Sequence, residues 1–89
     1  MPKYVVALFR IMPDDEDISL DDLADKVQGV LPEGVNVLGK DEEPIFGNLR
    51  ALKLQLAIPH DMEGTDAIEQ AIAEVEGVQR VEVEAVSML

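Results

Sequence analysis

Apolar runs and charged loops alternate along the chain, and the first apolar run covers residues 3–12 (KYVVALFRIM). Its β-branched and aromatic residues favour a strand that is covered on at least one face. The odd positions are all apolar, whereas the even positions include the charge of Arg10. Because successive side chains of a strand point to opposite faces, we expect helices over the odd set and an open sheet face on the even set. The odd set is Val5, Ala7, Phe9 and Ile11, and the even set is Tyr4, Val6, Leu8, Arg10 and Met12.

Two segments repeat apolar residues at a spacing of three to four, which predicts two amphipathic helices. The first follows Ser19, a good N-cap with Asp22 three residues later, and it ends before residues 32–34, which include a proline and a glycine. The second follows Thr65, which we expect to cap it, and it ends at Gly77. The apolar positions are Leu20, Leu23, Val27, Val30 and Leu31 in the first helix, and Ile68, Ala71, Ile72 and Val75 in the second.

Three further strands are predicted. Residues 35–43 are typical of an edge strand with a bulge, because Gly39 is followed by charges, and residues 44–48 (PIFGN) predict a turn-rich link. Residues 49–58 and residues 78–86 alternate between apolar and polar positions, as half-buried strands do. The apolar faces hold Leu52, Leu54, Leu56 and Ile58 in the former, and Val81, Val83 and Ala85 in the latter, opposite Arg80, Glu82 and Glu84.

The predicted order is strand, helix, strand, strand, helix, strand. Two right-handed crossovers around one central hairpin make this an α+β ferredoxin-like sandwich. Both helices have a single apolar face, so we expect them on the same side of a four-stranded antiparallel sheet. The length of 89 residues predicts one domain, residues 1–89.

The composition of the chain and the absence of certain segments argue against several functions. Nineteen acidic residues against seven Lys and Arg give a net charge of -12, which argues against binding a phosphate backbone. The absence of cysteine excludes disulfides, thiolate metal sites and cysteine nucleophiles. No apolar run approaches the ~20 residues of a membrane span, and residues 1–12 lack the features of a signal peptide. We therefore expect a cytoplasmic protein that contacts neither membrane nor nucleic acid.

Candidate reaction chemistry is weak. His60 could join a metal site with Asp61 and Glu63, but a metal centre needs three or four convergent ligands, so we expect a solvated loop. The acidic run 14–17 lacks the glycine and the final glutamate of a calcium loop. Nucleophile-elbow, P-loop and dinucleotide motifs are absent, and the segment 12–19 (MPDDEDIS) would repel a phosphate. We expect no catalysis, metal or cofactor.

The open sheet face is a candidate surface for recognition. Besides the even positions of the first strand, it would present Leu49, Ala51, Lys53 and Gln55. Apolar patches on such a mixed face can dock a partner, although scattered surface hydrophobic residues are also normal. Tyr4 is its one candidate aromatic and Glu82 and Glu84 lie nearby, so RNA binding is not expected.

Short motifs in a fixed order carry a resemblance that covers essentially the whole chain. They are residues 11–13 (IMP), 18–20 (ISL), 31–34 (LPEG), 41–45 (DEEPI), 46–47 (FG), 64–65 (GT), 75–78 (VEGV) and 81–83 (VEV), before a C-terminal leucine. Their order and spacing resemble the family of archaeal elongation factor 1-beta proteins, guanine nucleotide exchange factors for the GTPase elongation factor 1-alpha. The family has the ferredoxin-like sandwich that the periodicity also predicts.

The resemblance implies a mechanism and a set of contact residues. The factor would dock through one end of the sandwich and perturb the magnesium site and phosphate-binding loop of the GTPase, so that GDP leaves. In related factors a basic residue next to the final leucine reaches the magnesium region, and a turn aromatic followed by glycine precedes the third strand. The matching residues imply a partner-binding set of Phe46, Gly47, Ser87, Met88 and Leu89.

Two departures from the family pattern leave alternatives open. Met88 carries no charge, so the tail could act as a steric wedge, another group could substitute, or exchange could be weak. Met88 could also be an ordinary frayed terminus. Asn48 separates Gly47 from Leu49, and Phe46 could instead pack over the edge of the core.

We therefore expect a guanine nucleotide exchange factor that promotes GDP release from elongation factor 1-alpha in translation elongation, without catalytic chemistry of its own. The alternative is a small ferredoxin-like module that binds a ligand or regulates a partner, and that self-associates through its sheet face.

Overall fold

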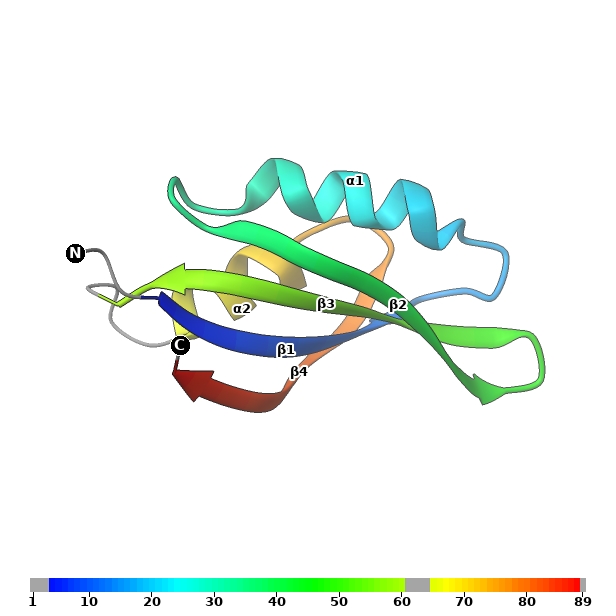
Figure 1. Ribbon diagram of the computed structural model, residues 1–89. Helices are drawn as coiled ribbons and strands as arrows, with labels where there is room; N and C mark the ends of the chain where they lie inside the picture. The colour runs from blue at the N-terminus through cyan, green and yellow to red at the C-terminus, as the bar shows by residue number, and fades with distance from the viewer. Residues whose placement is uncertain (1–3, 61–64, 89) are drawn as a thin grey trace.

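The order of elements is the predicted one. The structure, a computed structural model, describes residues 4–60 and 65–88. The elements are β1 (Tyr4–Pro13), α1 (Leu20–Val30), β2 (Asn36–Phe46), β3 (Leu49–Pro59), α2 (Asp66–Ala73) and β4 (Val78–Met88). The strands form one antiparallel sheet in the order β2-β3-β1-β4, with β1 and β3 in the centre (Figure 1). This order confirms the ferredoxin-like sandwich.

The core lies between the two helices and one face of the sheet. Phe9 and Ile11 of β1 and Leu54 of β3 have no exposed surface, as the alternation predicts. The buried residues from sheet and helices form one cluster. The helix residues in that cluster are Leu20, Leu23, Ala24, Val27, Ile68 and Ile72. The predicted stripe of α1 is wrong at Val30, which is 41% exposed, and the predicted end of the second helix at Gly77 is wrong, because α2 ends at Ala73 and the buried Val75 lies beyond it. We call the other side of the sheet the open face.

The two helices begin in different ways. The Ser19 hydroxyl accepts a hydrogen bond from the Asp22 N–H at 3.4 Å, so the predicted cap of α1 is confirmed. The predicted cap by the Thr65 side chain is wrong. Its backbone (φ -105°, ψ -2°) is already in the helical region, whereas a capping side chain needs the extended conformation that Ser19 has. The Thr65 hydroxyl instead lies 3.5 Å from Glu69 Oε2, within hydrogen-bond distance.

The strand β2 is longer than predicted. Its pairing with β3 continues to Phe46 opposite Leu49, so the predicted link at 44–48 is wrong and the turn consists of Gly47 and Asn48. Gly47 has φ +56°, and a glycine with positive φ at the first turn position matches the twist of a tight hairpin. The predicted bulge is confirmed, because the register shifts between Val37 and Gly39 on this edge strand.

A second bulge changes the phase of β4. Phe9 pairs with Val83 but Leu8 pairs with Ala85, so Glu84 is an extra residue in the ladder. Because a one-residue insertion moves the following side chains to the other face, Ala85 lies opposite an open-face residue and does not continue the apolar row of Val81 and Val83. The predicted placement of Ala85 is therefore wrong, as is the predicted end of the strand at residue 86, because pairing continues through residue 88.

We expect Leu54→Ala to lower the free energy of unfolding by about 2–5 kcal/mol, because it leaves a cavity at a fully buried position of a central strand. Leu38→Ala makes the same chemical change at a 53% exposed position and should stay within about 0.5 kcal/mol of the wild type. Urea unfolding followed by circular dichroism measures both. Equal losses in the two variants would contradict the assignment of the core.

Candidate partner-binding site

The structure separates the predicted contact residues into two groups at opposite ends of the sheet. Phe46 ends β2 and Gly47 begins the β2–β3 turn, beyond the end of β1. Ser87 and Met88 end β4 and pair with the start of β1, with Met88 opposite Val5. Figure 1 shows the turn at one extreme of the molecule and the C-terminus at the other. At about 3.3 Å per residue, β1 alone separates the groups by about 30 Å. One end of the sandwich therefore cannot present both groups.

The C-terminal group is part of the sheet. The backbone of Ser87 and Met88 continues the ladder with β1, so the alternative of a frayed terminus does not describe Met88. Leu89 lies outside the described residues. The tail is thus presented from an ordered edge strand.

The other group sits at the tip of a hairpin arm, residues 43–51. Pairing of β3 with β1 begins at Leu52, so the arm extends beyond the pairing with β1, and its two strands pair only with each other. Phe46 is 83% exposed, which rules out the alternative that this aromatic packs over the core edge. Where the arm begins, Arg50 Nη1 lies 3.6 Å from Oε1 of the preceding Glu42, and this ion pair joins β3 to β2.

A network of ion pairs crosses the open face of the sheet. Arg10 lies in the centre, with one guanidinium nitrogen 3.7 Å from Glu43 Oε1 and another 3.7 Å from Glu82 Oε2. Lys53 Nζ lies 2.8 Å from Glu43 Oε2 and 3.2 Å from Glu84 Oε1. Both cations are on central strands and the three glutamates are on the two edge strands, so the network joins all four strands.

This network perturbs the titration of its members. The hydrogen bond from Lys53 holds the pKa of Glu43 below its ordinary value of 4.5, and the charge of Arg10 acts in the same direction. Hydrogen bonds to Glu43 and then Glu84 raise the pKa of Lys53. Sequence reasoning placed Arg10, Lys53, Glu82 and Glu84 on the open face but missed Glu43, because pairing across a sheet depends on a register that local periodicity does not reveal.

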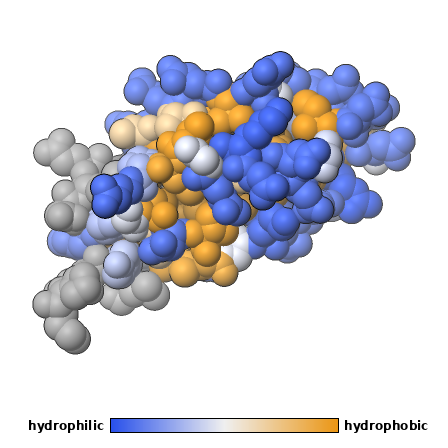
Figure 2. Space-filling view, turned by 90° about the horizontal axis from the view of Figure 1, so that it is seen from above, coloured by the Kyte–Doolittle hydropathy of each residue, from blue (hydrophilic) through white to orange (hydrophobic). Residues whose placement is uncertain are grey.

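The open face offers less apolar surface than the sequence suggested. Val6, Ala51 and Ala57 are buried, and Tyr4 and Leu8 are half-buried. A shallow hollow of about 350 Å³ lies beside Leu8 on this face, and its other lining residues are Gly39, Lys40, Asp41, Lys53 and Gln55. Among the residues whose burial the structure describes, the exposed large hydrophobic side chains are Val30, Leu38, Phe46 and Val86, and Val30 lies on α1, away from the sheet. Figure 2 looks from above onto the side of the molecule that carries α1, not onto the open face, and it shows a patch of apolar side chains with hydrophilic side chains around it.

The residues considered for metal binding belong to two segments of the sequence, residues 60–63 and the acidic run 14–17. His60 is exposed in the turn after β3, while Asp61 and Glu63 lie outside the described residues. The four residues of the acidic run 14–17 are exposed, and Asp15 Oδ1 accepts a hydrogen bond from the Asp17 N–H at 3.0 Å. Within residues 4–60 and 65–88 no three metal-binding side chains cluster. In the same described part of the chain, no helix has the length and apolar character needed to cross a membrane.

Comparison with known proteins defines the class. Residues 6–89 match the model of the EF-1 guanine nucleotide exchange domain, so the chain belongs to this family, and its role is guanine nucleotide exchange in translation elongation. Its relatives include the elongation factor 1-beta proteins of archaea. Those of Staphylothermus marinus and Aeropyrum pernix are 43% and 44% identical to it, over 92% and 96% of both chains. That of Haloarcula marismortui is 38% identical, over 96% of this chain and 97% of its own length.

Solved structures with low sequence identity share the fold alone. The ACT domain from the GTP pyrophosphokinase of Chlorobium tepidum superposes with a TM-score of 0.59 at 20% identity, over 91% of this chain and 99% of its own. The C-terminal domain of the MgtC protein from Mycobacterium tuberculosis gives 0.61 at 11% identity, over 93% and 87%. Both similarities support the ferredoxin-like arrangement.

We expect Lys53→Met to reduce the loss of stability in acid. Because its folded pKa is depressed, Glu43 stabilises the fold above pH 4.5, and this contribution is lost as the pH falls through the folded pKa. Without Lys53 the pKa of Glu43 should rise toward 4.5, and the free energy of unfolding should fall less steeply below that pH.

Carbon-detected NMR of the glutamate carboxyls and urea unfolding at several pH values measure these two effects. Lys26→Met is the control, because it removes the same charge from an exposed position on α1 that takes no part in the network. An unchanged Glu43 pKa in Lys53→Met would contradict the ion pair.

Proposed function

We propose that this chain binds the GTPase elongation factor 1-alpha and promotes the release of its GDP. The observation that carries the proposal is the match to an exchange domain over residues 6–89. A protein that binds the nucleotide-free GTPase more tightly than the GDP form must, by thermodynamic linkage, weaken GDP binding by the same factor. Exchange therefore needs differential contacts to the partner and no reaction centre in this chain. Its place of action is the cytoplasm, where translation elongation occurs.

The two contact groups act at a distance from each other. Phe46 and Gly47 anchor one end of the molecule on the partner, and the last residues of β4 act at the other end. The partner must therefore lie along the length of the sandwich, whose longest extent is 44 Å. This is why we revise the expectation of a single docking end and retain all five predicted contact residues. The tail reaches the nucleotide site from an edge strand whose backbone is fixed by pairing with β1.

The charge of the chain assists the encounter. A net charge of -12 attracts basic surfaces and accelerates association, an effect that salt screens over about 10 Å at 0.1 M. Ion pairs keep cations of the open face close to their own glutamates, so the acids outside the network dominate the field that a partner meets.

The direct test uses the cognate elongation factor 1-alpha loaded with fluorescent GDP. We expect this chain, at a small fraction of the GTPase concentration, to accelerate GDP release in an excess of unlabelled nucleotide. Catalytic action is expected because the factor dissociates when the new nucleotide binds. An unchanged release rate, together with a concentration-dependent dimer in sedimentation, would contradict the proposal and favour the alternative of a self-associating regulatory module.

We expect Met88→Lys to maintain or raise the exchange rate. A positive charge next to the last residue of the chain would oppose the magnesium ion of the partner by like-charge repulsion. Gln79→Lys is the control, because it adds the same charge at the other end of β4 and should leave the rate unchanged. The same fluorescent GDP assay measures both. A large drop in Met88→Lys alone would contradict this expectation and show that the methionine makes a specific apolar contact.

A further inference from the structure

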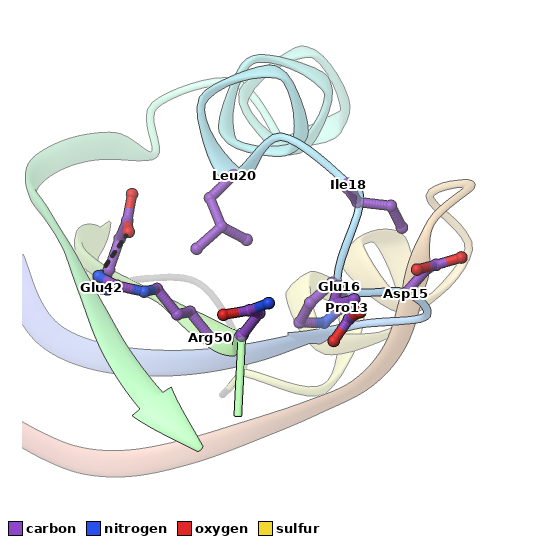
Figure 3. Close-up of a pocket in the computed structure, with 8 residues that line it drawn as sticks. Pro13, Asp15, Glu16, Ile18, Leu20, Glu42 and Arg50 are labelled. Atoms are coloured by element: carbon purple, nitrogen blue, oxygen red, sulfur yellow. Dashed lines mark ion pairs between the residues drawn. The ribbon is translucent and has the colours of Figure 1, made fainter. Parts of the chain in front are cut away.

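A hollow of about 170 Å³ lies at the hairpin-arm end of the molecule (Figure 3). Its lining comes from two regions that are far apart in sequence: the end of β1 through the loop to the start of α1, and the hairpin arm with the adjacent Glu42. Its volume is several times the roughly 30 Å³ that one water molecule occupies in the liquid, so it has room for a long side chain.

One wall of the hollow is apolar. Pro13 and Leu20 are buried and Ile18 is half-buried, and all three line the hollow. Figure 3 shows Leu20 and Ile18 on one side of the space and Pro13 at its base. Such a wall suits methylene groups, whereas a hydrated small ion would gain nothing from it.

The remaining lining is polar and carries a net negative charge. Asp15 and Glu16 come from the loop and Glu42 comes from β2, against the one cation Arg50, and the Asn48 amide also lines the space. Glu42 already has a cation beside it, since Arg50 Nη1 lies 3.6 Å from Glu42 Oε1. No ion pair of the described residues involves Asp15 or Glu16. Asp15 Oδ1 accepts the Asp17 N–H, so Glu16 and the second oxygen of Asp15 remain for a second cation.

We propose that this hollow receives an arginine side chain of the partner protein. The aliphatic stem packs on the apolar wall, and the guanidinium donates hydrogen bonds to Asp15 and Glu16 from the side opposite Arg50. Arginine fits better than lysine because its planar group offers five donors and meets carboxylates that approach from different directions. A divalent metal ion is the weaker occupant, because no three metal-binding side chains converge in the described part of the chain. The proposal rests on the proposed function for the identity of the partner.

Its position gives the hollow a role in docking. Asn48 and Arg50 belong to the same arm that carries Phe46, so a partner seated on this aromatic also faces the hollow. The exposed ring and the acidic hollow together recognise an apolar site next to a basic side chain.

The first test needs no GTPase. The full chain, labelled with ¹⁵N, is titrated with N-acetyl-arginine N-methylamide and, separately, with the neutral isostere N-acetyl-citrulline N-methylamide. We expect the arginine compound to shift amides within 13–20 and 42–50, and the citrulline compound to shift them far less. Glu16→Gln should weaken this binding about threefold, the size of one exposed ion pair. Asp17→Asn, which removes a charge from the same loop but not from the hollow, should change it much less.

Equal shifts with citrulline, or equal losses in the two variants, would overturn the proposal. A second measurement compares the affinity of Glu16→Gln and Asp17→Asn for the cognate elongation factor 1-alpha. A larger loss in Glu16→Gln supports the arginine site, and equal affinities would overturn it in the complex. Specific arginine binding by a chain that does not bind the GTPase would instead contradict the proposed function, so the two failures are distinguishable. Circular dichroism of both variants confirms that they are folded.

Discussion

The pairing of β1 with β3 is the constraint on which the rest of the structure depends. These central strands pair without interruption from Tyr4 opposite Pro59 to Ile11 opposite Leu52, and the buried pair of Phe9 and Leu54 lies in that stretch. A slip of one residue would turn every core side chain to the open face, so the burial of one face fixes the register. Both helices then have a single apolar surface on which to pack.

The bulges of the sheet lie on its edge strands, whereas the pairing of the two central strands is regular. One bulge follows Val37 in β2 and another lies at Glu84 in β4. Because an edge strand pairs on one side only, the extra residue disturbs a single ladder of hydrogen bonds. The bulges also determine what the edges present. Leu38 is exposed beside the first bulge, and Val86 is exposed after the second, opposite a helix-side residue of β1.

Charge and shape together explain how so acidic a chain folds and still presents a partner surface. Arg10 and Lys53 each lie between carboxylates of the edge strands, so the glutamates of the open face are compensated within the sheet. Another pair, between Lys40 and Asp21 at 2.8 Å, joins β2 to α1, and its hydrogen bond lowers the pKa of Asp21. The acidic run 14–17 is exposed to solvent, and it lies beside the arm that projects Phe46.

The sequence by itself determined the order of elements, the helix-covered face of the central strands, the cap at Ser19 and the bulge near Gly39. These follow from side-chain periodicity and from the chemistry of a few neighbouring residues. Only the tertiary structure decided the length of both edge strands, the bulge at Glu84, the exposure of Phe46 and its distance from Ser87. It also brought the loop after β1 and the hairpin arm together around one hollow. Each of these depends on pairing or packing between segments far apart in the chain, and local periodicity carries no information about such contacts.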